Sequence, residues 1–438
     1  MNVINYMKSN KVFSICMLLY IIITFPLMFN HTPWFDEAHA WILAKFINFS
    51  NWSDIVKSEG HPVVWYLMLT PFAKTNLQNL YPYPMLVINY LFCLTAIVIM
   101  WLKSPFNNFF KIAITFSFMF LQYFPIVARN YSMGVLGLFW LAAYYKQMTR
   151  KPIMYAAIVA LTLQTHAICA IGASWFGILL LYNLLKENSD KKNVLFSALI
   201  MIGSVIFFAY PFMNGYGDET YRMFSSPGII HLLYFIFAWH GLVGLLYLII
   251  FFYILIKNNL KSKLFLIYTT TLLAILFLCF YAGFAQHFIF FFLYLIMAFW
   301  INDIQSSDKN FNKIYIVLSI LILLPINAYF QSHFFWDNEL NLRQVVYDIK
   351  SQKYISPDNP LLIDIRFYPI IPYLNEYRIY DTCREGEIDI SHTLYCPQKI
   401  VPSALKNKYI YYLTGNAIDG IMPVYNYNNV LFIYRKKG

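Results

Sequence analysis

The sequence predicts a polytopic α-helical membrane protein with a small C-terminal α/β domain. Of its 438 residues, 60% are apolar and only 12% are charged, about half the charged fraction of an ordinary soluble domain. Runs that approach the roughly 20 apolar residues of a membrane-spanning helix recur from Val12 to Phe330. Shorter runs with a strand-like pattern follow them. We therefore expect a transmembrane domain at 1–330 and an α/β domain at 331–438.

The apolar runs divide into about eleven expected membrane spans, separated by short polar breaks. We place them at 12–29, 82–102, 110–126, 131–146, 152–167, 168–185, 194–212, 229–256, 264–281, 284–302 and 314–330. The segment 59–74 is different, because Pro71 and Lys74 interrupt it after about a dozen apolar residues. We expect this segment to form an interfacial or re-entrant helix in the first outer loop.

The basic residues predict the topology, because cytoplasmic loops are enriched in Lys and Arg. With the N-terminus in the cytoplasm, the cytoplasmic breaks hold fifteen basic residues and the outer loops hold five. An odd number of spans then makes the C-terminal domain extracytoplasmic, in a multi-pass protein of the plasma membrane. The same clusters account for much of the net charge of +11, so we do not expect nucleic-acid binding.

The C-terminal region shows a pattern typical of a small α/β domain. A helix is predicted at 342–350, and strand-like runs occupy 360–367, 409–415 and 429–435. These runs contain no paired acids, Gly-rich loop or His cluster. We therefore expect an accessory module that contributes to acceptor selection.

The cysteines fall into two groups with different expected roles. Four lie inside apolar runs and are expected to pack as small hydrophobic side chains: Cys16, Cys93, Cys169 and Cys279. Cys383 and Cys396 lie in the C-terminal region and are free to pair in an oxidising compartment. No Cys-x-x-Cys spacing typical of a metal site occurs.

Most of the unusual ionisable residues of the membrane region fall at the expected outer ends of the helices. Such groups are costly at membrane depth and usually face a cavity with a function. The first outer loop carries an acidic pair and several histidines, and single residues follow in later loops. The candidate site residues are Asp36, Glu37, His39, Glu59, His61, Arg129, His166 and His287.

The stretch HTPWFDEAHAWILAK, residues 31–45, predicts a helix that lies along the membrane interface. Thr32 is expected as the N-cap and Pro33 as the first helical residue, with Asp36 and Glu37 in the favourable first turns. Both acids are then expected at the wet interface. Trp34, Ala38 and Trp41 would share an anchoring face.

Each of these residues also has a structural interpretation. The acids can simply complement the helix dipole, and the tryptophans can belong to an aromatic belt. His166 and His287 can be hydrogen-bonded core histidines, and Arg129 can extend to a lipid phosphate. A second acid and histidine beside a proline, in EGHP at 59–62, favours a functional interpretation of the first outer loop.

The ordered motifs resemble a branch of the bacterial membrane glycosyltransferases with the GT-C fold. The motifs are DEAHAW (36–41), EGHPVVWYLML (59–69), PIVARNYSMGVL (125–136), THA (165–167) and QHFIFFF (286–292). The branch is related to the protein mannosyltransferases and to the aminoarabinose transferase that acts on lipid A. The resemblance covers most of the membrane region and is weaker in the C-terminal domain. It departs from the family at Gln286, where the family pattern has an arginine before the histidine.

The resemblance implies transfer of a sugar from a polyprenyl-phosphate donor to an extracytoplasmic glycan, lipid or protein acceptor, with inversion. In the family the acidic pair of the first outer loop holds the catalytic carboxylate. This implies Asp36 as general base, with Glu37 in support. Substrate contacts would come from His39, Glu59, His61, Arg129, His166 and His287. No cofactor is required, although a divalent cation held by Asp36 remains an open alternative.

Two other functions share parts of this pattern. A transporter or flippase of lipid-linked sugars could use the same acids and histidines as a relay. Transporter sites usually lie near the bilayer midplane between two related halves, whereas the ionisable residues here lie at the outer rim and the sequence has no internal repeat. A ligase of wall or capsule polymers would share the architecture and differ in its acceptor.

The predicted topology can be checked with reporter fusions. Fusions at Ser189 and at Gly438 are expected to report opposite sides of the membrane, since the basic residues place the first in the cytoplasm and the second outside. Activity of a periplasm-specific and a cytoplasm-specific reporter at each position measures this. Both fusions on one side would contradict the shared outer position of the candidate residues.

Overall fold

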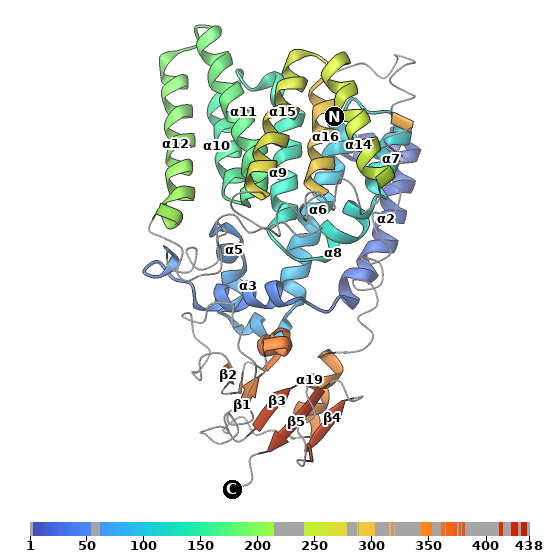
Figure 1. The fold of residues 1–438 in the computed structure, drawn as a ribbon, viewed down its shortest axis with the longest axis vertical. Coiled ribbons are helices and arrows are strands. Elements are labelled where there is room, and N and C mark those ends of the chain that lie inside the picture. Colours follow the sequence, from blue (N-terminus) through green and yellow to red (C-terminus); the bar gives the residue numbers. More distant parts are fainter. Residues whose placement is uncertain are drawn as a thin grey trace. The chain divides into compact units, whose positions relative to one another are not determined.

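The computed structural model is mostly helical (Figure 1). It describes residues 3–53, 62–213, 241–277, 287, 289–302, 315–316, 319, 342–352, 361–363, 365–374, 376–377, 379–381, 411–414, 422–427 and 431–435. The chain forms two compact units. The first unit comprises Met1–Met28, Gly60–Val63 and Ile88–Ala328, and the second comprises Phe29–Glu59, Val64–Val87 and Tyr329–Gly438.

Several helices have the length and apolar composition of membrane spans. Within the described ranges these are four, or five if one bent pair is counted as a single span. The four are α2 (Lys11–Asn30), α6 (Tyr83–Lys103), α11 (Ala167–Lys186) and α12 (Lys191–Met213). The structure therefore describes a helical chain compatible with a membrane protein. The number of eleven membrane spans stays a prediction.

The remaining helices of the first unit are shorter. They include α1 (Val3–Ser9), α9 (Tyr131–Tyr144), α10 (Pro152–Leu163), α14 (Gly241–Lys257), α15 (Leu260–Ile275) and α16 (Ile289–Asn302). Helix α9 continues into the 3-10 turn η3 (Tyr145–Gln147). Apart from α1, their positions follow the predicted runs, with ends that differ by several residues. The last predicted span, 314–330, falls almost entirely outside the described residues.

The run predicted as a continuous span at 110–126 is broken. Helix α7 (Asn108–Thr115) is followed by a π-helical turn, η2 (Met119–Tyr123), and by α8 (Phe124–Ile126), with a bend of 50° between the two parts. At the break, Ser117 Oγ donates to Ile114 O (2.7 Å) and so competes with the helical pattern. Beyond it, the carbonyl of Phe124 accepts from Asn89 Nδ2 (2.8 Å) and from Ser132 Oγ (2.6 Å). Side chains thus satisfy backbone groups that a broken helix leaves free.

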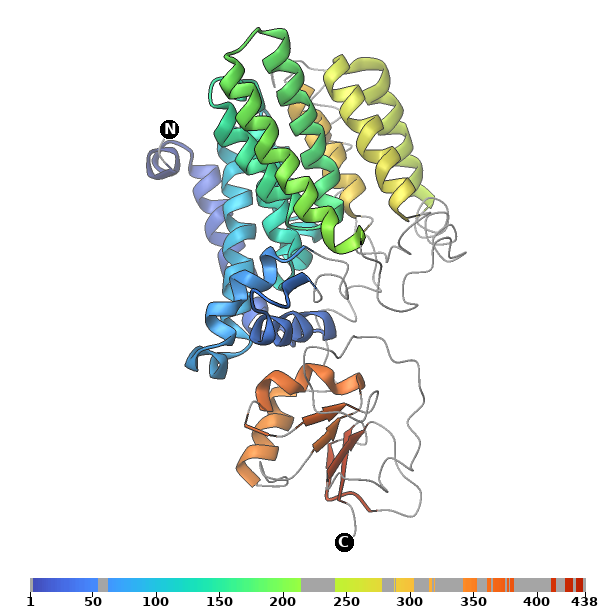
Figure 2. The same ribbon diagram turned by 90° about the vertical axis from the view of Figure 1, so that its left-hand side faces the viewer.

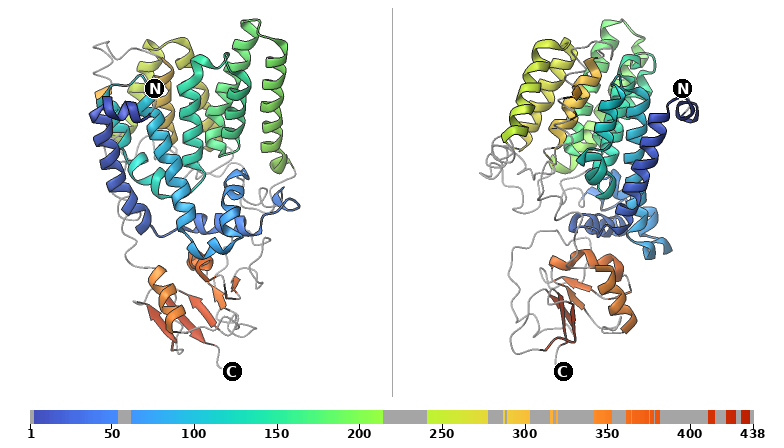
Figure 3. Two further views of the ribbon diagram at one scale, coloured as in Figure 1. Left: turned by 180° about the vertical axis from the view of Figure 1, so that it is seen from behind. Right: turned by 90° about the vertical axis from the view of Figure 1, so that its right-hand side faces the viewer.

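Helix packing in the first unit relies on close approach at small residues. Helices α10, α11, α15 and α16 run side by side in Figure 3. Tyr294 of α16 lies so close to Gly172 of α11 that its hydroxyl accepts from the Gly172 N–H (3.0 Å). A Cβ at position 172 would lie 2.6 Å from a ring carbon of Tyr294. Buried Cys16, Cys93 and Cys169 pack as expected in helices of this unit.

The second unit joins the helices after α2 to the C-terminal region. Its helices are α3 (Phe35–Phe46), α5 (Val64–Ala73), the 3-10 segment η1 (Asn76–Leu80) and α19 (Leu342–Gln352). A mixed sheet has the order β2 (Ile379–Asp381), β1 (Leu361–Ile363), β3 (Tyr411–Thr414), β5 (Leu431–Arg435) and β4 (Tyr425–Tyr427). Strand β1 is parallel to β2 and β3, and β5 is antiparallel to β3 and β4. Figure 2 shows α19 and the 3-10 segment η7 (Ile365–Leu374) together beside the sheet.

The predicted α/β character of the C-terminal region is confirmed, with one correction. Helix α19 and strands β1, β3 and β5 fall on the predicted runs. The run predicted as a strand at 360–367 ends at Ile363, and the chain turns into η7. Pro369 and Pro372 lie in η7 and lack the N–H that a central strand needs. Cys383 and Cys396 lie outside the described residues.

A single apolar core connects α3 to the C-terminal region within the second unit. Ala38 and Ile42 of α3 belong to one buried cluster with Val345 and Ile349 of α19 and with residues of η7 and the sheet, including Leu374. Segment η7 contacts both α3 and α19. This contradicts the expected anchoring face, because Ala38 and Trp41 are buried inside the protein. The apolar stripe of an amphipathic helix packs against the protein core when other elements of the protein form one beside it. Helix α5 lies within the 59–74 segment. Its ten residues are too few for it to cross a bilayer.

The Gly172 contact gives a stability test. Gly172→Ala is expected to destabilise the protein by about 1 to 3 kcal/mol, because the new methyl group overlaps Tyr294 and Leu138 in a packed interface. The matched control is Gly203→Ala in α12, where a Cβ meets nothing within 4 Å. Thermal unfolding in detergent or nanodiscs measures both. Equal behaviour of the two variants would contradict the close approach.

Candidate functional site

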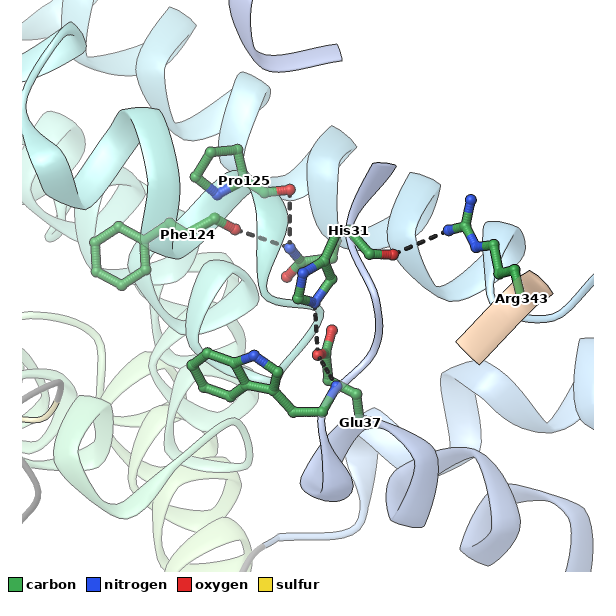
Figure 4. A network of polar contacts seen from close by, with 7 residues as sticks. His31, Glu37, Phe124, Pro125 and Arg343 are labelled. Carbon is green, nitrogen blue, oxygen red and sulfur yellow. Dashed lines mark hydrogen bonds and ion pairs between the residues drawn. The ribbon is translucent and has the colours of Figure 1, made fainter. Parts of the chain in front are cut away.

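The acidic stretch after α2 is organised around the carboxylate of Glu37. Glu37 Oε2 accepts from the backbone N–H of Trp34 (2.7 Å) and lies 2.8 Å from Nε2 of His31 (Figure 4). Helix α3 begins at Phe35 with Trp34 as its N-cap, so the expected cap at Thr32 and helical Pro33 are wrong. Glu37 is at the third helical position, and its side chain accepts the backbone N–H of the N-cap residue Trp34. This contact caps the helix without a Ser or Thr side chain.

Glu37 is fully buried, which contradicts the expectation that both acids lie at a wet interface. The side chain of His31 is 3% exposed and that of Glu37 is 0% exposed. Burial of a carboxylate is costly unless hydrogen-bond donors surround it. His31 and the start of α3 supply those donors. His31 is a site residue that was not predicted from the sequence.

Asp36 differs from its neighbour in position and exposure. Consecutive helical residues point about 100° apart, and Asp36 is only partly buried. Asp36 therefore presents a carboxylate beside the buried pair without sharing its burial. His39, one turn along, is buried and stacks on the ring of Phe35 with centroids 6.3 Å apart.

Arg343 of α19 also contacts this region, and it was not predicted from the sequence. Its Nη1 donates to Phe29 O (2.6 Å) and its Nη2 donates to His31 O (2.9 Å). The guanidinium also lies 5.1 Å from the ring centroid of Tyr83. One sequence signal for Arg343 exists: it occupies the first turn of α19, where a cation opposes the helix dipole and needs another partner.

Buried and partly buried aromatic side chains lie next to these charges. Tyr81 is in contact with Trp41 (centroids 5.3 Å apart) and with Tyr373 (4.8 Å). Burial raises the pKa of Tyr81 well above its usual value, and the charge of Glu37 adds to this shift. Burial also raises the pKa of Tyr373 to about 12, although the Arg343 charge lowers it in part. Both phenols are therefore neutral at physiological pH.

A second group of candidate residues lies in the first unit. The hydroxyl of Tyr131 and Nε2 of His287 are 2.8 Å apart, and the Tyr131 ring lies 4.6 Å from that of His166. The rings of His166 and His287 are parallel to within 14°, with centroids 6.4 Å apart. The guanidinium of Arg129 lies 5.3 Å from the Tyr131 ring centroid. The structure therefore brings together three residues predicted separately, Arg129, His166 and His287, around a tyrosine that was not predicted.

His166 has a defined role in this group. It is the N-cap of α11, and its Nδ1 accepts from the N–H of Ile168 (3.1 Å). Because Nδ1 accepts a hydrogen bond, the ring proton of neutral His166 is on Nε2. His166 is thus a structural cap whose second nitrogen is a donor.

The other predicted site residues cannot be placed. Glu59 and His61 lie outside the described residues, as does Gln286. Among the side chains that the structure describes, no three His, Cys, Asp or Glu residues gather in a group that could hold a metal ion. The possible metal role of Asp36 stays a hypothesis.

Comparison of the chain with models of protein families, with curated proteins and with solved structures found no match.

Different costs are expected for neutralising the two acids. Glu37→Gln replaces charge-assisted hydrogen bonds to His31 and Trp34 with neutral ones and should lower stability by about 1 to 3 kcal/mol. Asp36→Asn, the matched control in the same helical turn, should cost about 0.3 to 1 kcal/mol. Equilibrium or thermal unfolding of both variants measures the difference. Equal small losses would show that Glu37 is not a buried anchor.

Proposed function

We propose that this chain is a membrane glycosyltransferase of the GT-C type, which transfers a sugar from a polyprenyl-phosphate donor to an extracytoplasmic glycan, lipid or protein. The proposal includes about eleven spans in the plasma membrane, a cytoplasmic N-terminus and an extracytoplasmic C-terminal domain. The observation that carries it is the arrangement of the acidic pair, in which one carboxylate is buried and hydrogen-bonded while its neighbour Asp36 is partly exposed. The ordered sequence motifs support the same function.

In this mechanism Asp36 takes the proton of the acceptor hydroxyl as its oxygen attacks the anomeric carbon. The bond from that carbon to the phosphate oxygen breaks, and its electron pair leaves with the polyprenyl phosphate. A single displacement inverts the anomeric centre and needs no covalent enzyme intermediate. Glu37 supports the geometry of Asp36 and does not itself exchange a proton with the substrate.

Stabilisation of the leaving phosphate is assigned to cationic and N–H groups. Arg129, His166 and His287 are the candidates in the first unit, where Tyr131 contacts all three. His61 is a further candidate for the phosphate, and His39 and Glu59 are proposed to bind the substrate. A divalent cation on Asp36 is the alternative role for that carboxylate.

A transporter or flippase of lipid-linked sugars is the second candidate. One observation favours it, because the bent pair of α7 and η2–α8 is a discontinuous helix of the kind on which transporter sites are often built. The two functions differ in their products. A transferase releases free polyprenyl phosphate, whereas a flippase leaves the sugar on its lipid.

The proposed chemistry predicts a large loss of turnover for Asp36→Asn. The amide keeps the size of the side chain but cannot accept the proton, so the rate should fall about 10²- to 10⁴-fold. Glu37→Gln should lose less at matched folded fraction. Sugar transfer and release of polyprenyl phosphate by purified protein are measured together, alongside mass spectrometry of surface glycans with and without the protein.

Three outcomes separate the alternatives. Near-normal turnover of Asp36→Asn would remove its assignment as the base. Loss of donor binding instead of turnover would assign Asp36 to metal or phosphate binding. Movement of the lipid-linked sugar across vesicles without release of polyprenyl phosphate would favour the flippase.

A further inference from the structure

Arg343 binds the backbone at the end of α2. The carbonyl of Phe29 is one of the last four of that helix, which have no partner within it. Arg343 Nη1 donates to this carbonyl, and Nη2 donates to the carbonyl of His31 beyond the helix end. A guanidinium at a helix C-terminus is also favoured by the helix dipole. Arg343 therefore caps α2 from a position more than 300 residues away in sequence.

The same contact fixes the segment that leads to the acidic pair. Arg343 holds the backbone of His31, whose ring is bound to the carboxylate of Glu37, which in turn binds the N–H of Trp34. Figure 4 shows Arg343, His31 and Glu37 in succession along this path. Asp36 is the residue next to Glu37 in the first turn of α3. A displacement of the turn would therefore displace Asp36.

The far side of α3 is fixed by the same part of the chain. Ala38 and Ile42 pack into the core that contains Val345 and Ile349 of α19. Helix α19 thus shares an apolar core with the acidic helix, in which η7 contacts both, and it contacts the preceding turn through Arg343. The C-terminal region is therefore joined both to the turn before α3 and to the apolar face of α3.

We propose that Arg343 is a positioning residue for Asp36, through which the C-terminal region sets the geometry of the acidic site. This inference rests on the proposed transferase function for its catalytic consequence. It gives the C-terminal region a role beyond acceptor selection, because the region supplies a contact that the site requires.

The geometry requires arginine and not merely a positive charge. Two nitrogens of one guanidinium reach two carbonyls while its plane lies near the ring of Tyr83. A lysine ammonium is a compact point charge without this planar fork. Arg343→Lys should therefore loosen the turn before α3 as much as Arg343→Gln does, although the lysine keeps the positive charge.

The matched control is Lys350→Gln. Lys350 lies two turns along the same helix and forms an exposed ion pair with Glu376 (3.2 Å). Its substitution removes one positive charge from α19 without touching the turn at Phe29 to Trp34. Exposed pairs of this kind contribute little to stability.

The test compares hydrogen–deuterium exchange in the full-length protein in nanodiscs for wild type, Arg343→Lys, Arg343→Gln and Lys350→Gln. Amides of residues 31–37 other than Pro33 are expected to exchange about 10- to 100-fold faster in both Arg343 variants, since the loss of charge-assisted hydrogen bonds loosens the turn. Exchange in α10 and α11 serves as the folding control. Lys350→Gln should match wild type throughout.

Sugar transfer from a polyprenyl-phosphate-linked hexose is measured on the same preparations. The kcat of both Arg343 variants should fall about 100-fold with little change in the KM for the donor, because a small misplacement of a catalytic group affects chemistry more than binding. Unchanged exchange in residues 31–37, or full activity of either Arg343 variant, would overturn the proposal. If wild type transfers no sugar, the proposed function fails, and the exchange comparison alone decides whether Arg343 holds the turn.

Discussion

The burial of one carboxylate determines much of the structure around the candidate site. Glu37 has no exposed surface, and a buried carboxylate is stable only where donors converge on it. Its donors include the ring of His31 and the N–H of Trp34. These contacts fix where α3 begins and where the preceding turn lies. They also leave Asp36, on a different side of the helix, as the more exposed carboxylate.

The sequence predicted the presence of this helix but not its surroundings. The acid-rich first turn and the apolar positions at Ala38 and Ile42 indicated a short amphipathic helix, which is present. The apolar face was assigned to lipid because a single sequence does not show what an apolar stripe packs against. The actual partner is a core formed by residues roughly 300 or more positions later, in η7, α19 and the sheet, with η7 in contact with α3. Burial of Glu37 was missed for the same reason.

The histidines show a similar limit. His166 and His287 were each interpretable as isolated core residues, and sequence analysis could not join them because 121 positions separate them. The structure places both rings against Tyr131, with Arg129 on the same ring. The position of these residues at the ends of helices could be predicted from the periodicity and composition of the sequence. Their assembly into one group depends on how α9, α11 and the segment before α16 pack.

The long separation between α3 and its core has a consequence for biosynthesis. Ribosomes add about 5 to 20 residues per second, so α3 would be complete roughly 15 to 60 seconds before α19 begins to emerge, and the sheet follows later. During that interval the apolar face of α3 and the end of α2 lack the partners that they have in the finished protein. Until then, the end of α2 and the apolar face of α3 contact other surfaces, such as lipid or a chaperone. Packing of the acidic helix into this core is thus a late event, although its sequence is among the first to be made.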